Sequence, residues 1–107
     1  MSAVHINEVQ YRSLVREQTP VLVAFQAPWC GYCRKIEAAY HRIAQNRKDN
    51  LIVATLNIDA HPELARELEI EVVPTLILYR DGQELDSIVA PESQVMIEGF
   101  LRRALDI

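Results

Sequence analysis

The chain has 107 residues, a formal net charge of −4, 50% hydrophobic residues and 2 cysteines. This length predicts one domain, residues 1–107, around one hydrophobic core, and the composition is that of a globular protein rather than a disordered or fibrous one. The acidic balance gives no support for nucleic-acid binding, because a surface that follows phosphates needs an excess of Lys and Arg.

The sequence opens without a basic segment followed by an apolar one, and no apolar run approaches the roughly 18 residues of a membrane helix. We therefore expect no membrane association and a cytoplasmic location. In that compartment two neighbouring thiols are more often catalytic than structural.

The first half of the chain alternates between predicted strands and helices. A short strand is expected at 3–6, followed by a helix that Asn7 caps and that ends at Arg16. The nearly continuous apolar run 21–26 predicts a strand buried on both faces, near the centre of a sheet. Apolar residues then recur at intervals of three and four, which predicts an amphipathic helix ending near Asn46. Its expected buried residues are Cys33, Ile36, Tyr40, Ile43 and Ala44.

The second half predicts a buried strand at 51–59 and a short helix at 63–68 with Pro62 in its first turn. Two strands joined through a helix are expected to run parallel. Asp81-Gly82 predicts a tight hairpin between strands at 76–80 and 84–89. A closing helix capped by Ser93 is expected to bury Val95, Met96, Phe100 and Leu105. This order predicts an α/β fold, a central mixed β-sheet flanked by helices on both faces.

Cys30 and Cys33 lie between the strand at 21–26 and the helix that follows it. A cysteine at a helix start faces unpaired backbone N–H groups and the positive end of the helix dipole, which both stabilise a thiolate. Residues three apart on a helix also lie within the distance that a disulfide requires. The spacing therefore predicts a dithiol that opens and closes at the carboxyl edge of a central strand.

Several short motifs occur along the chain: Phe25 and Ala27 with Trp29-Cys30-Gly31-x-Cys33, then Leu56-Asn57-Ile58-Asp59, Val73-Pro74-Thr75-Leu76, Asp81-Gly82 and Phe100-Leu101. On these residues the sequence resembles the thioredoxin family from about Asn7 to Leu105. The resemblance implies a thioredoxin fold and a thiol–disulfide oxidoreductase that reduces protein disulfides, with Cys30 as the exposed nucleophile and Cys33 as the resolving thiol.

The resemblance also implies a substrate-binding surface beside the two thiols. Pro74 is expected to be a cis-proline that faces the pair, with Val73 offering its backbone to an extended substrate. Trp29, Gly31 and Tyr32 complete the expected substrate contacts. The implied partners are disulfide-bearing proteins and a recycling system based on a thioredoxin reductase or on glutathione. We expect a monomer without metal or cofactor.

Four residues depart from the family pattern: Ala24 replaces a buried carboxylate, Tyr32 and Ala38 replace prolines, and Ala90 lies near a family glycine. Because alanine cannot accept the proton of Cys33, we expect slower release of reduced substrate than in carboxylate-bearing relatives. Glu37 is a candidate substitute acceptor through water, although the helical pattern predicts that it faces solvent. Tyr32 keeps a backbone N–H that proline lacks, which predicts a somewhat stronger oxidant.

Other classes of function fit parts of the same pattern. A disulfide oxidase or isomerase would use the same dithiol at a different potential, and a non-enzymatic interaction module would keep the fold without turnover. The two cysteines could instead be structural core residues. A zinc or iron–sulfur site needs further ligands, and His5, His41 and His61 have no ligand spacing relative to the pair. A cluster shared between two chains remains an alternative.

Overall fold

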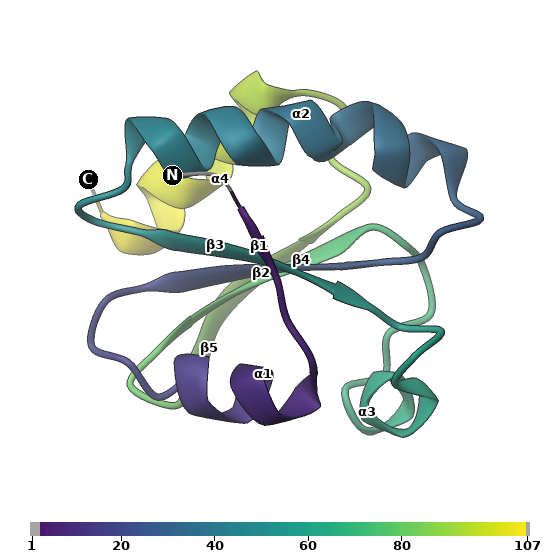
Figure 1. Ribbon diagram of the computed structural model, residues 1–107. Helices are drawn as coiled ribbons and strands as arrows, with labels where there is room; N and C mark the ends of the chain where they lie inside the picture. Colours follow the sequence, from purple (N-terminus) through teal and green to yellow (C-terminus); the bar gives the residue numbers. More distant parts are fainter. Residues whose placement is uncertain (1–2, 107) are drawn as a thin grey trace.

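The computed structural model describes residues 3–106 and shows strands and helices in the predicted order (Figure 1). In chain order the elements are β1 (Val4–His5), α1 (Glu8–Leu14), β2 (Val21–Gln26), α2 (Gly31–Asn46), β3 (Ile52–Asn57), α3 (Pro62–Glu67), β4 (Thr75–Arg80), β5 (Gln83–Val89) and α4 (Gln94–Leu105).

The strands form one mixed sheet in the order β1-β3-β2-β4-β5. β3 runs parallel to β1 and β2, whereas β4 runs antiparallel to β2 and β5. Helices α2 and α4 cover one face of the sheet, and α1 and α3 cover the other (Figure 1). The prediction of a central mixed sheet with helices on both faces is confirmed.

Strand β2 lies at the centre of the sheet, and its residues Val21 to Phe25 are fully buried. Because successive side chains of a strand point to opposite faces, Leu22 and Ala24 join the core beneath α2 and α4, while Val21, Val23 and Phe25 join the core against α1 and α3. Burial on both faces explains why this segment is a nearly continuous apolar run.

Local signals determine where several elements begin and end. Asn7 caps α1, its side chain accepting from the Gln10 N–H, and the helix ends at Leu14 rather than at Arg16. Helix α2 ends at Asn46 as predicted. Asp81 and Gly82 form the two-residue turn of the β4–β5 hairpin, with φ angles of 55° and 81° that are typical of the mirror-image turns hairpins favour.

The apolar stripe predicted for α4 is partly wrong. Phe100 is buried as predicted and Leu105 packs partly buried against the core, but Val95 is 75% exposed and Met96 is also exposed. The helix buries Ile97 and Leu101 along with Phe100, at intervals of three and four residues from Ile97. Val9 of α1 is also exposed. Among residues 3–106, the structure contains no helix with the length and apolar character needed to cross a membrane.

Candidate active site

The predicted dithiol lies where β2 ends and α2 begins. Cys30 is the N-cap of α2, with an extended backbone, and its Sγ accepts the Cys33 N–H at 3.1 Å. Serine commonly fills this role in other helices, and here a sulfur takes the place of the hydroxyl oxygen. The sequence spacing thus places one sulfur of the pair at the positive end of a helix.

The two thiols differ in access to solvent. Both cysteines are free, Cys30 is 7% exposed and Cys33 is 2% exposed. Cys30 is therefore less exposed than the resemblance implies, although it remains the more accessible of the two. Burial, together with the hydrogen bond and the charge of Cys30, raises the pKa of Cys33 from 9.0 to about 11. At neutral pH Cys33 is a protonated thiol.

Val73 and Pro74 lie beside the dithiol, as expected. Their peptide bond is cis, and Cys30 Sγ lies 3.9 Å from the Val73 carbonyl oxygen. The Pro74 carbonyl accepts the Ala90 N–H at 2.8 Å, which ties this segment to the end of β5. Tyr32, Ile58 and Val73 pack against the buried cluster of Ala27, Cys30 and Cys33.

The remaining predicted contact residues surround the same site. Trp29 is 67% exposed next to Cys30, and Gly31 is exposed at the start of α2. A Cβ at Gly31 would meet only the Arg34 side chain, at 3.8 Å, so packing alone does not require glycine here. The Tyr32 hydroxyl donates to the Pro91 carbonyl at 2.5 Å. Sequence reasoning missed this bond, because the partners are 59 residues apart and carry no shared motif.

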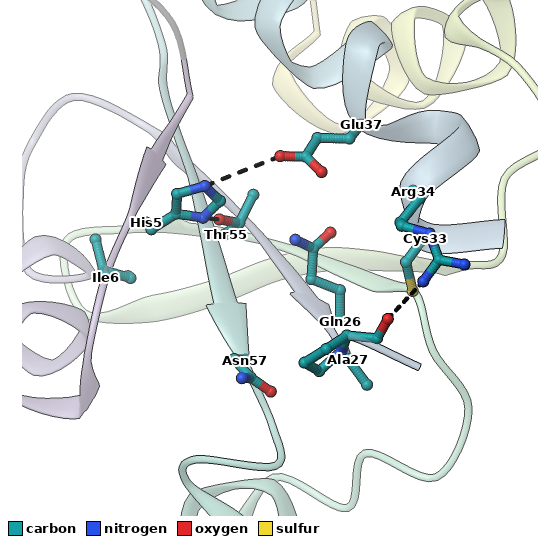
Figure 2. A pocket seen from close by; sticks show the side chains of 10 residues that line it. His5, Ile6, Gln26, Ala27, Cys33, Arg34, Glu37, Thr55 and Asn57 are labelled. Carbon is teal, nitrogen blue, oxygen red and sulfur yellow. Dashed lines mark hydrogen bonds and ion pairs between the residues drawn. The ribbon is translucent and has the colours of Figure 1, made fainter. Parts of the chain in front are cut away.

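Behind Cys33 the structure has a cavity of about 450 Å³ (Figure 2). Glu37 lines it with a side chain that is 31% exposed, so Glu37 faces this cavity and is only partly exposed to solvent. The lining also contains His5, Gln26, Arg34, Thr55 and Asn57.

The sheet register explains why polar groups gather in this cavity. His5 of β1 pairs with Thr55 of β3, and Thr55 pairs with Ala24 of β2. Side chains at paired positions share a face of the sheet, and this face lies beneath α2. Gln26 lies two residues beyond Ala24 and points to the same side. His5 was not predicted as a site residue, because the register of β1 cannot be read from its two residues.

Metal binding has little support in the described part of the chain. Within residues 3–106 the histidine, cysteine and acidic side chains form no group of three or more that could hold a metal ion. His61 Nε2 accepts the Glu8 N–H at 3.3 Å.

Comparisons with known proteins agree with this geometry. The thioredoxin family model matches residues 2–103. Thioredoxin 1 of Synechococcus elongatus is 34% identical over 104 residues, which cover 96% of this chain and 97% of that protein. The bifunctional thioredoxin reductase/thioredoxin of Mycobacterium leprae is 34% identical over 87 residues, covering 81% of this chain and 19% of its own length.

A solved thioredoxin structure from Malassezia sympodialis superimposes with a TM-score of 0.85 at 22% identity, covering 96% of this chain and 91% of that one. This likeness shows the fold, and the family match and sequence relatives show the family. The chain thus belongs to the thioredoxin family and is a thiol–disulfide oxidoreductase.

Proposed function

We propose that this oxidoreductase reduces disulfides of protein substrates, with Cys30 as the attacking thiol and Cys33 as the resolving thiol. The observation that carries the assignment is the asymmetry of the pair. Cys30 Sγ lies at the α2 N-terminus and accepts an N–H, which favours negative charge on that sulfur, while Cys33 is nearly inaccessible.

The reaction then proceeds in two exchanges. The Cys30 thiolate attacks one sulfur of the substrate disulfide, and the other sulfur leaves as a thiolate that takes a proton from solvent. Cys33 loses its proton and attacks Cys30 Sγ, so that the Cys30–Cys33 disulfide forms and the substrate departs with its second sulfur reduced. The substrate gains two electrons and the protein loses two.

An extended substrate segment would lie along Val73, whose carbonyl oxygen is 3.9 Å from Cys30 Sγ. Main-chain pairing at such an edge binds peptides of varied sequence, because it uses backbone groups. The exposed Trp29 ring and the half-buried Tyr32 ring would supply apolar contact on either side of the bond to be broken.

The oxidised protein would be recycled by a thioredoxin reductase. Support comes from the Mycobacterium leprae relative, whose name joins the two activities in one chain. We further propose that the protein acts as a single-domain monomer in a reducing compartment such as the cytoplasm, where a free dithiol persists between turnovers. Gel filtration and cell fractionation test these two points.

Reduction of insulin in the presence of dithiothreitol tests the activity, and NADPH consumption with an added thioredoxin reductase tests the recycling. Cys30→Ser should abolish both. Cys33→Ser should accumulate a covalent mixed disulfide between Cys30 and the substrate, visible by non-reducing electrophoresis and mass spectrometry. A Cys33→Ser protein that turns over normally, or a mixed disulfide formed through Cys33, would contradict the assigned order.

A further inference from the structure

The second exchange needs a place for the Cys33 proton. Only a thiolate attacks a disulfide, and burial raises the pKa of Cys33 to about 11. The thiol is 2% exposed, so bulk water does not reach it freely. Any acceptor must therefore come from groups that line the space next to Cys33.

The cavity behind Cys33 contains such a group. Glu37 lies one helical turn beyond Cys33 on α2, and both residues line the cavity. Glu37 Oε2 is 3.9 Å from His5 Nε2 and 3.7 Å from His41 Nε2 (Figure 2 shows the His5 contact). A carboxylate between two imidazoles can accept a proton, and an imidazole whose facing nitrogen is unprotonated can then take that proton from it.

The hydrogen bonds of the two histidines indicate where the proton leaves. His41 Nδ1 accepts the Ala3 N–H at 3.2 Å, so a neutral His41 carries its proton on Nε2, toward Glu37. His5 Nδ1 bonds Thr55 Oγ1, which leaves Nε2 facing the carboxylate. The His5 side chain is 71% exposed and can exchange protons with solvent.

Gln26 places a polar atom at this cavity that water would satisfy. Its Oε1 atom is buried and has no hydrogen-bond partner among residues 3–106. A buried polar atom without a partner is costly, and a polar cavity of about 450 Å³ has room for several waters that would satisfy it. Figure 2 shows the Gln26 side chain between Cys33 and the His5–Glu37 pair. Water bound there would bridge the thiol to the carboxylate.

We propose that Glu37, which lies between His5 and His41 and is reached through water at Gln26, accepts the Cys33 proton in the second exchange. This inference rests on the proposed role of Cys33 as resolving thiol. The S–H proton passes through water to the Glu37 carboxylate, and the Cys33 thiolate attacks Cys30 Sγ. The electron pair of the broken S–S bond leaves with the substrate sulfur, and the proton on Glu37 passes to His5 and then to solvent.

The charged and titratable groups around the relay come from two elements. Helix α2 contributes Arg34, Glu37 and His41, together with the buried Tyr40 behind them, and β1 contributes His5. The cavity-lining residues of β2 and β3 are the neutral Gln26, Thr55 and Asn57. If replacing Glu37 changes the pH profile of the second exchange, the change therefore arises from these few groups.

Stopped-flow reaction of the reduced protein with dithiobis-nitrobenzoate separates the two exchanges. Attack by Cys30 releases one nitrothiobenzoate at a rate proportional to reagent concentration, and attack by Cys33 releases a second at a rate independent of it. Glu37→Gln should slow the second release by about tenfold or more at neutral pH, within the range of lost proton-transfer catalysis, and leave the first within about twofold. In Glu37→Gln the rate of the second release should then rise about tenfold per pH unit, because it follows the fraction of Cys33 that is ionised. The wild-type rate should rise less steeply.

Three variants separate a relay from a structural effect. Glu37→Asp should recover part of the second rate, and formate added to Glu37→Ala should restore it where chloride at equal ionic strength does not. Glu84→Gln removes the same charge from β5, at the opposite edge of the sheet from β1, and should leave both rates unchanged. A Glu37→Gln protein with the wild-type second rate and pH profile would overturn the relay alone. A wild-type protein that releases a single nitrothiobenzoate would overturn the role of Cys33 and the relay with it.

Discussion

At the scale of single residues, the chemistry of this protein depends on two cysteines in unequal surroundings. Cys30 caps a helix and Cys33 lies inside its first turn. The sequence predicted this placement, because the strand, the spacing and the helix are all local signals. It did not predict the depth of burial, which depends on Ile58 and Val73 from distant parts of the chain.

Because of Cys33, the free energy of unfolding of the reduced protein falls at alkaline pH. Its folded-state pKa is raised from 9.0 to about 11, so folding favours the protonated thiol. That stabilisation is complete below about pH 9 and is lost as pH rises through about 11, because the unfolded thiol ionises first. Denaturant titrations should show a fall of up to about 2 kcal/mol in unfolding free energy over this range.

Cys33→Ser serves as the control for that titration. Burial also raises the pKa of Tyr40, which adds a loss of the same sign, so the thiol's share is the difference between the two proteins. Parallel curves for the wild type and Cys33→Ser would show that Cys33 ionises in the folded protein as easily as in the unfolded one.

Tyr32 is expected to make the dithiol more oxidising. Proline at this position would remove a backbone N–H from the first turn of α2, where unpaired donors stabilise the reduced sulfur. Redox titration of Tyr32→Pro against glutathione should give a potential lower by roughly 20 mV, which corresponds to about 1 kcal/mol. The same measurement on Tyr32→Phe isolates the hydroxyl, which bonds Pro91 rather than a cysteine. Equal potentials for the wild type and Tyr32→Pro would remove Tyr32 from the explanation.

At the scale of elements, the turn from β5 to α4 carries a residue in an unfavourable conformation. Ala90 has a φ of 47°, in the left-handed region, while its N–H bonds the Pro74 carbonyl at 2.8 Å. L-residues other than glycine adopt this region at a cost of roughly 1–2 kcal/mol. Ala90, which lies near a glycine of the family pattern, thus occupies a position where the backbone favours glycine.

Ala90→Gly is expected to stabilise the protein by about 0.5–1 kcal/mol, since relief of strain exceeds the added entropy of the unfolded chain. Urea denaturation measures the effect. Gly82→Ala is the matched control at a φ of 81° in the hairpin turn and should destabilise by about 1 kcal/mol. If Ala90→Gly proves destabilising, packing of the alanine methyl group outweighs the backbone strain.

The starts of α1 and α4 were easier to predict than the buried face of α4. The caps Asn7 and Ser93 act on backbone groups within one turn, so both appear in the sequence as local signals. The face of α4 depends on how the helix lies against α2 and the sheet. Val95 and Ile97 are equally apolar, and only packing decides that Ile97 is buried.

At the scale of the whole molecule, a hydroxyl pair joins α1 to the sheet. Tyr11 donates to the Tyr79 hydroxyl at 2.9 Å inside the core, and its ring meets Phe25 edge-on at 6.0 Å. Burial raises the pKa of Tyr79. The pair links segments 68 positions apart in the chain.

Tyr11→Phe should destabilise the protein by about 1–2 kcal/mol, because it leaves the Tyr79 hydroxyl buried without its partner. The double variant Tyr11→Phe/Tyr79→Phe should recover part of the loss, since no unpaired hydroxyl then remains. Chemical denaturation of the four proteins completes the cycle. If the losses of unfolding free energy in the two single variants simply add in the double variant, the two hydroxyls do not depend on each other for a hydrogen-bond partner.

The sequence by itself determined the order of strands and helices, the buried central strand and the dithiol at a helix start. Those features follow from periodicity, caps and turn residues, which act between neighbours in the chain. The tertiary structure alone decided that Tyr32 bonds Pro91, that Cys30 lies beside Val73, and that Glu37 faces His5 across a cavity. Such contacts depend on strand register and helix packing, and these are set by the burial of the whole core rather than by any local pattern.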